Sequence, residues 1–187
     1  MFFLNFIGGI GYYMLSDYGV GPLIVDVLKS LDLNNTIVED LSYNTVAIYH
    51  RLIEGDYSKI ILVGARKTGS SSVGHVRVYN LDEVNEPDES TLQRYIGDSV
   101  GGLIDIGSVT YFLKYYAPEL EKKVSIIEIE AGEIREGNKI NYEVVKSLPY
   151  LLKLVLEKVN QESLYSIALQ KLNEILRKEY NVILLGD

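Results

Sequence analysis

The first residues in this sequence that could carry out chemistry lie in a glycine-rich stretch near the N-terminus, GGIGYYMLSDYGVGP at positions 8–22. Its one carboxylate is Asp17, and Tyr12 and Tyr18 lie on either side of it. The stretch follows an apolar run and precedes a helical apolar pattern, so it predicts a strand-to-helix connection. Glycines allow tight turns there, and free N–H groups gather where the helix begins. Asp17 can therefore act on a ligand at this end of a sheet, or it can be held by those N–H groups in a structural role.

Histidine is the other side chain suited to acid–base or metal chemistry near neutral pH, and the chain has two. His50 lies in a predicted helix at 46–54, where we expect a structural role. His75 begins a predicted strand after the polar loop 66–72, and it could serve a site there or be an ordinary strand residue. A rebuilt metal site could combine Asp17, His75, Asp98 and Asp105.

Several other chemistries are excluded or disfavoured. The absence of cysteine excludes disulfides, thiolate metal sites and a cysteine nucleophile. The glycines at 9 and 11 lack the third glycine of a dinucleotide motif, and the serines at 70–72 have no Gly-x-Ser-x-Gly elbow. A net charge of −8 and a pI near 4.9 argue against nucleic-acid binding.

The composition also bears on where the protein works. No apolar run reaches the ~18 residues of a membrane span, and no basic leader precedes the first apolar segment. We therefore expect a cytoplasmic protein without a membrane partner. Fifteen tyrosines, with plentiful Ile, Lys and Glu, indicate a heat-adapted (thermophile) source.

The elements that must position these residues alternate along the chain. Apolar or alternating runs predict strands at 2–7, 36–40, 59–65, 73–79 and 124–131, with a last one at 182–185. Helical patterns fall at 19–31, 46–54, 91–96, 103–116, 142–159 and 161–180. Asn141 is a candidate helix cap, and Pro149 predicts a kink or break. The order predicts an α/β fold of three layers, with a mainly parallel twisted sheet and helices on both faces.

The glycine-rich stretch resembles the opening motif of the nickel–iron hydrogenase maturation endopeptidases, G-x-G-N-x-L-x-x-D-[DE]-G-x-G. The matching residues are Gly9, Gly11, Asp17, Gly19 and Gly21, with Leu15 shifted by one place. The similarity continues to about position 159, which we take as the family-like domain 1–159. Residues 160–187 form a C-terminal helix–strand extension that packs on the same domain or exchanges with a second chain as a homodimer.

Members of that family cleave a C-terminal tail from the hydrogenase large subunit after nickel insertion, through a metal-contacting site of two carboxylates and a histidine. Carried over by this resemblance, the three positions are Tyr18, Gly64 and Gly101, and the motif asparagine is Tyr12. Glycine offers no donor atom, and a neutral phenol is a poor ligand for nickel or zinc. The resemblance therefore implies a family scaffold without catalytic residues, metal ligands or a resident cofactor.

Three functions remain open. The first is a non-catalytic or regulatory paralogue (a pseudoenzyme) that binds a polypeptide, either a hydrogenase large subunit or a maturation factor. The second is a working metal-dependent endopeptidase with relocated ligands for nickel or zinc, and the third is a small-molecule binding protein. Aromatic rings provide large contact areas with polar tips, although rings can also fill the space that lost ligands leave. The predicted cleft and partner-binding residues are Asp17, Tyr12, Tyr18, Asp40, Tyr43, Gly64, His75 and Gly101.

Overall fold

A five-stranded sheet forms the centre of the protein, and the computed structural model describes it within residues 4–100 and 104–184. The strand order is β2-β1-β3-β5-β4. The strands are β1 (Asn5–Ile10), β2 (Thr36–Asp40), β3 (Lys59–Arg66), β4 (Val76–Asn80) and β5 (Val124–Glu130). All neighbouring pairs are parallel except β4 with β5. The carboxyl ends of four strands therefore meet at one edge.

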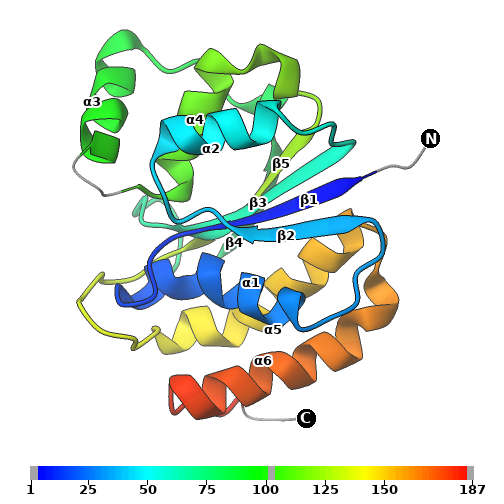
Figure 1. Cartoon of the computed structure of the whole chain (residues 1–187). Helices are drawn as coiled ribbons and strands as arrows, with labels where there is room; N and C mark the ends of the chain where they lie inside the picture. The colour runs from blue at the N-terminus through cyan, green and yellow to red at the C-terminus, as the bar shows by residue number, and fades with distance from the viewer. Residues whose placement is uncertain (1–3, 101–103, 185–187) are drawn as a thin grey trace.

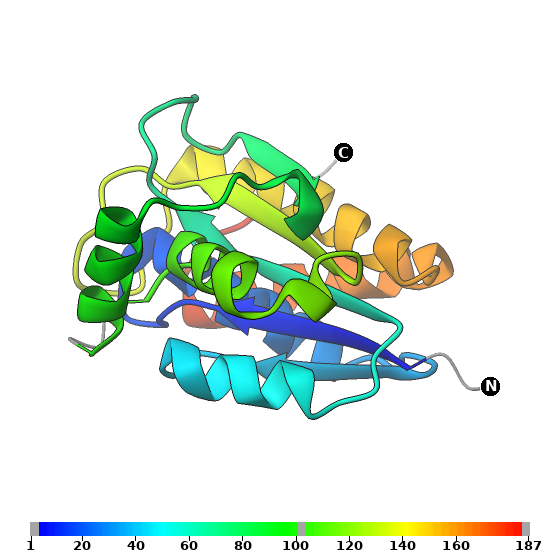
Figure 2. The same ribbon diagram turned by 90° about the horizontal axis from the view of Figure 1, so that it is seen from above.

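Helices cover both faces of this sheet (Figure 1). One face carries α1 (Val20–Lys29), α5 (Tyr142–Lys158) and α6 (Tyr165–Glu179), and the other carries α2 (Thr45–Ile53) and α4 (Ile106–Tyr116). The remaining helix, α3 (Glu89–Val100), packs beside α4 at the carboxyl-end side of the sheet, as Figure 2 also shows. Short 3₁₀ turns lie at Ser16–Gly19, Leu81–Glu83, Pro118–Leu120 and Glu162–Leu164. The predicted fold class is confirmed.

Alternation along the strands builds two hydrophobic cores. In β1, Ile7 faces the core under α1, α5 and α6, whereas Phe6 and Ile10 face the core under α2 and α4. In β5, Ile127 and Ile129 face the first core. Glu128 and Glu130 alternate with these isoleucines and therefore project to the α4 side near the carboxyl edge.

Helix α1 lies unusually close to β1 because glycines line their contact. A β-carbon on Gly9 would lie 2.4 Å from the Gly21 carbonyl oxygen. A β-carbon on Gly21 would lie 2.3 Å from the Ile10 carbonyl oxygen. Any larger residue would push α1 off the sheet. The motif glycines are thus explained by helix–strand packing.

Several sequence-based boundaries were wrong. Helix α3 runs through 97–100, beyond the predicted helix end at 96, and α5 continues through Pro149 without a break. Leu148, Leu151 and Leu152 are fully buried around that proline, so tertiary packing holds the helix together.

The strand expected at 182–185 does not form over its described part, 182–184. Asn181 adopts a left-handed conformation (φ 53°), and the Val182 N–H then donates to the Leu176 carbonyl. The chain turns back, and Val182 and Leu184 pack on the core instead of extending the sheet. Leu185 lies outside the described residues. In the part of the chain that the structure describes, no helix combines the length and apolar character of a membrane span.

Candidate functional site

Asp17 joins the two connections that flank the carboxyl edge of the sheet. Its carboxylate is fully buried and accepts hydrogen bonds from the Gly132 N–H (2.8 Å), the Asn141 N–H (2.7 Å) and the Asn141 side-chain amide (2.6 Å). These donors lie between β5 and α5, not at the start of α1 where we expected them. The Asn141 side chain makes no cap hydrogen bond to α5, because its amide is turned to Asp17.

Further contacts reinforce this junction. The Ser16 N–H donates to the Gly137 carbonyl (2.8 Å), and the Gly137 N–H donates to the Met14 carbonyl (2.9 Å). The Ser16 hydroxyl donates to the Lys139 carbonyl (2.7 Å). Ser16 has a φ of 51°, a left-handed conformation that is rare for serine. The segment 133–141 is therefore held rigidly against the β1–α1 connection.

Tyr12 and Tyr18 lie together after β1, since the Tyr12 N–H donates to the Tyr18 carbonyl (2.8 Å). The Tyr12 hydroxyl accepts a hydrogen bond from the Ile104 N–H (3.0 Å). Burial, aided by the nearby charge of Asp105, raises the pKa of Tyr18 to about 12. Tyr18 is thus a neutral phenol at physiological pH and a poor ligand for a divalent ion.

Gly64 lies beside this pair, on the α4 side of β3. A β-carbon there would lie 2.6 Å from the Ile10 carbonyl oxygen and 3.3 Å from the Ile106 β-carbon. Backbone and helix have closed over the position, so it has no room for a side chain. Gly101 lies outside the described residues.

The carboxyl edge also contains a buried ion network that the sequence analysis did not identify. Glu128 and Glu130 are 2% and 1% exposed. Arg77 bridges them: its Nε lies 2.7 Å from Glu128 Oε1, and its Nη2 lies 2.9 Å from Glu130 Oε2. Arg66 Nη1 lies 3.9 Å from Glu128, and the Tyr79 hydroxyl donates to Glu128 (2.8 Å). Two buried negative charges are thereby balanced by two guanidinium groups.

Glu130 in addition holds the loop 67–72 in place. It accepts hydrogen bonds from the Thr68 N–H (2.7 Å), the Thr68 hydroxyl (2.6 Å) and the Gly69 N–H (2.8 Å). Burial opposes ionisation of Glu130, but these bonds and Arg77 outweigh it and lower its pKa to about 2. A carboxylate ionised so strongly is a poor general acid or base near neutral pH. The signal in the sequence was two glutamates within an otherwise apolar strand.

The remaining predicted residues lie at opposite edges of the sheet. Asp40 ends the edge strand β2 and accepts the Ser42 N–H (2.9 Å), and the Tyr43 hydroxyl donates to Glu39 (3.2 Å). His75 is exposed beside β4 at the other edge. Four strand spacings separate β2 from β4, about 19 Å. The structure therefore brings Tyr12, Tyr18 and Gly64 together but does not bring Asp40 to His75.

A protein site for a divalent ion typically needs three side-chain ligands close together. Within 4–100 and 104–184, no three His, Asp or Glu side chains gather in a way that could hold an ion. Asp105 caps α4 by accepting the Ser108 N–H (2.8 Å), and His50 is exposed on α2. The Asp98 side chain lies outside the described part. The phenol of Tyr18 and the closed position of Gly64 do not fit a divalent ion.

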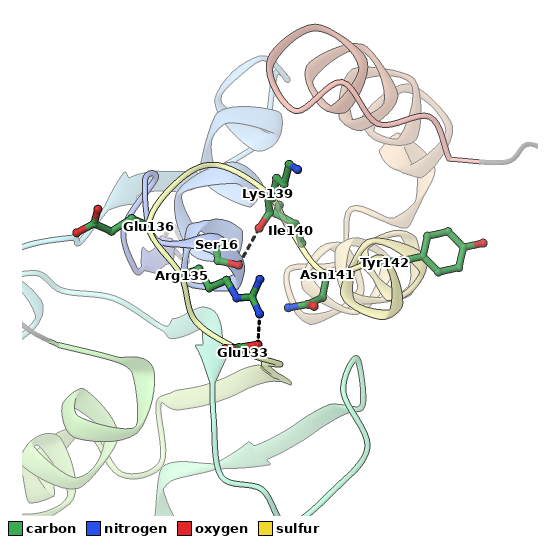
Figure 3. A pocket seen from close by; sticks show the side chains of 8 residues that line it. All are labelled: Ser16, Glu133, Arg135, Glu136, Lys139, Ile140, Asn141 and Tyr142. Carbon is green, nitrogen blue, oxygen red and sulfur yellow. Dashed lines mark hydrogen bonds and ion pairs between the residues drawn. The ribbon is translucent and has the colours of Figure 1, made fainter.

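A cavity of about 390 Å³ opens on the other side of Asp17. Figure 3 shows its lining: Ser16, Glu133, Arg135, Glu136, Lys139, Ile140, Asn141 and Tyr142. The Arg135 guanidinium points into the space between Ser16 and Asn141 and pairs with Glu133, whereas the tips of Glu136, Lys139 and Tyr142 point away. The lining of the cavity is about half polar and half apolar, and its walls are the segments described above.

No protein-family model matches the chain, and no curated protein matches its sequence. Solved structures do match its fold. The hydrogenase maturating endopeptidase HybD from E. coli aligns with a TM-score of 0.60 at 12% identity, over 84% of this chain and 93% of its own. A NiFe hydrogenase maturation protease HycI from Thermococcus kodakarensis KOD1 aligns with a TM-score of 0.57 at 12% identity, over 84% and 92%.

A hydrogenase 2 maturation peptidase from Thaumarchaeota archaeon SCGC_AB-539-E09 aligns with a TM-score of 0.53 at 20% identity, over 85% of this chain and 99% of its own. The chain therefore has the fold of the hydrogenase maturation proteases, as the motif resemblance predicted.

Proposed function

We propose that this protein is a non-catalytic relative of the hydrogenase maturation proteases that binds a polypeptide partner at the carboxyl edge of its sheet. The observation that carries the proposal is Gly64, a position that the motif resemblance makes a metal-contacting carboxylate. Here it has no side chain, and a β-carbon would lie 2.6 Å from the Ile10 carbonyl oxygen. Restoring a ligand there would require β1 and α4 to move apart.

The neighbouring polar groups support the same proposal. Tyr18 is a neutral phenol, and Glu128 and Glu130 are committed to Arg66, Arg77 and the loop 67–72. A network in which charges are paired and buried is suited to holding a scaffold in shape. It offers no free base or ligand for hydrolysis.

The β1–α1 connection is the surface that we assign to the partner. Tyr12 and Tyr18 are half-buried on it, Tyr13 is exposed, and Met14 is 65% exposed. Aromatic and methionine side chains are enriched at protein interfaces. The fully buried Asp17 would position this connection rather than touch the partner. Since solved structures that match this fold include hydrogenase maturation proteases, a hydrogenase large-subunit precursor is the first partner to test.

The test is capture and cleavage of a purified, nickel-loaded large-subunit precursor. We expect capture without cleavage, and we expect Met14→Glu to weaken it at least tenfold, because a charge would enter the interface. Tyr12→Ala with Tyr18→Ala should weaken capture as well, with folding checked by circular dichroism. Tyr150→Ala is the matched control, an exposed tyrosine on α5. Cleavage of the precursor would refute the non-catalytic role, and equal capture by all variants would refute the surface.

A further inference from the structure

The cavity beside Asp17 has a largely exposed cation at its open side that the proposed function does not use. Arg135 carries the guanidinium that points between Ser16 and Asn141 (Figure 3). Its partner Glu133 is an exposed carboxylate only two residues away. Exposed pairs of this kind contribute little free energy, so an incoming ligand can displace Glu133.

The walls of the cavity are already built. The segment 133–141 is tied to the β1–α1 connection through Ser16 and Asp17, and the Asn138 amide donates to the Glu179 carbonyl at the end of α6 (2.8 Å). A ligand would therefore meet a preformed site and would not have to order a loop. The rare left-handed backbone of Ser16 lies in this wall, and strain of that kind concentrates at functional positions.

The chemistry inside the cavity favours an anion of planar shape. A guanidinium presents parallel N–H donors that match a carboxylate. The Asn141 amide and the Ser16 hydroxyl lie beside it but already donate to Asp17 and to the Lys139 carbonyl, so the guanidinium supplies the N–H donors for a ligand. The 17-residue helix α5 begins at the same wall with the positive end of its dipole. A volume of about 390 Å³ accommodates an amino acid or the last residues of a peptide.

We propose that this cavity is a carboxylate-binding site centred on Arg135, which takes the carboxylate of a free amino acid or of a polypeptide C-terminus. Arg135 forms the bidentate contact, and Glu133 is the internal competitor that the ligand displaces. The site adjoins the partner surface at Ser16 but uses other side chains, so binding of a carboxylate at Arg135 does not depend on the proposed function.

The test is calorimetric titration of the full chain with alanine, with tetra-alanine, and with the C-terminally amidated tetra-alanine. We expect saturable binding of alanine, of tetra-alanine or of both, and at least tenfold weaker binding of the amide. Binding of alanine alone identifies a small-molecule source, and binding of the tetrapeptide alone identifies a chain terminus. Both outcomes support the site.

Two substitutions connect such binding to this cavity. Arg135→Gln should weaken it at least tenfold, whereas Arg94→Gln, an exposed arginine on α3, should leave it unchanged. Glu133→Gln should strengthen it several-fold, because the competing carboxylate is gone. Absence of saturable binding, equal binding of the amidated peptide, or an unchanged affinity of Arg135→Gln would each overturn the proposal.

Discussion

The α-carbon of Gly64 lies so close to the end of β1 that a β-carbon on it would be 2.6 Å from the carbonyl oxygen of Ile10. This contact bears directly on function. It occurs where the motif resemblance requires a metal-contacting carboxylate, and it involves backbone atoms that cannot rotate away. A carboxylate side chain therefore has no space at this position.

Gly64→Asp should for this reason fail to create a metal site and should destabilise the protein. We expect a loss of about 2–4 kcal/mol in the free energy of unfolding, from overpacking and from burying a charge. Urea denaturation measures the loss, and titration with Ni²⁺ and Zn²⁺ tests for the site. The matched control is Gly97→Asp on α3, where a β-carbon meets nothing within 4 Å. A stable Gly64→Asp variant that binds Zn²⁺ tightly would contradict the closed position.

Asp17 should behave as a structural anchor. In Asp17→Asn, one amide N–H must face a backbone or side-chain N–H of Gly132 or Asn141, since all three partners of the carboxylate are donors. We expect a loss of about 2–3 kcal/mol, measured by urea denaturation. Asp26→Asn changes a surface acceptor of the Tyr13 hydroxyl and should cost less than about 1 kcal/mol. Equal stability of Asp17→Asn and wild type would return Asp17 to the candidates for direct ligand contact.

The C-terminal extension should be part of the folded domain. Helix α6 places Ala168, Leu172 and Leu176 in the core beneath α1 and α5, all fully buried. Leu172→Ala should cost about 2–4 kcal/mol, while Ile167→Ala, which is 47% exposed, should cost less than about 1 kcal/mol. A chain ending at Val159 should aggregate or change its oligomeric state in size-exclusion chromatography. A soluble monomer of unchanged stability would show that the extension is an accessory.

Periodicity was sufficient to predict the layers of the fold but not the contacts of the site. The run at 59–65 is apolar because both faces of β3 are covered, and this signal is local. The partners of Asp17 lie 115 and 124 residues further along the chain, so no local pattern indicates them. The position of Asp17 before a helix suggested that N–H groups hold its carboxylate in a structural role, and the structure shows such hydrogen bonds. The donors, however, are Gly132 and Asn141 and not the N–H groups at the start of α1.

The ion network illustrates the same limit. Alternation along the predicted strand 124–131 puts Glu128 and Glu130 on one face, as in the structure, but it does not indicate that this face is buried. Their cations come from β3 and β4, at Arg66 and Arg77. Pro149 shows the opposite case, because a strong local signal for a helix break was overridden by the buried leucines around it.

Glu130 should make stability depend on pH in the acid range. Its pKa is about 2 in the folded protein against 4.5 for an ordinary glutamate, so the folded state favours the ionised form. The resulting stabilisation is complete above pH 4.5 and is lost as the pH falls toward 2. It should decrease by about 2 kcal/mol between pH 6 and pH 3.

Glu130→Gln isolates this contribution. The variant should be less stable than wild type at pH 6, because Arg77 loses one of its two charged partners. The difference in the free energy of unfolding should shrink by about 2 kcal/mol at pH 3 in urea denaturation. Asp88 also has a pKa lowered to about 2, through hydrogen bonds from Ser90 and Thr91 at the start of α3. Asp88→Asn is therefore the control, and because this carboxyl is exposed it should leave most of the pH dependence in place. If Glu130→Gln and wild type lost stability in parallel over this range, the acid sensitivity would have to originate from groups other than Glu130.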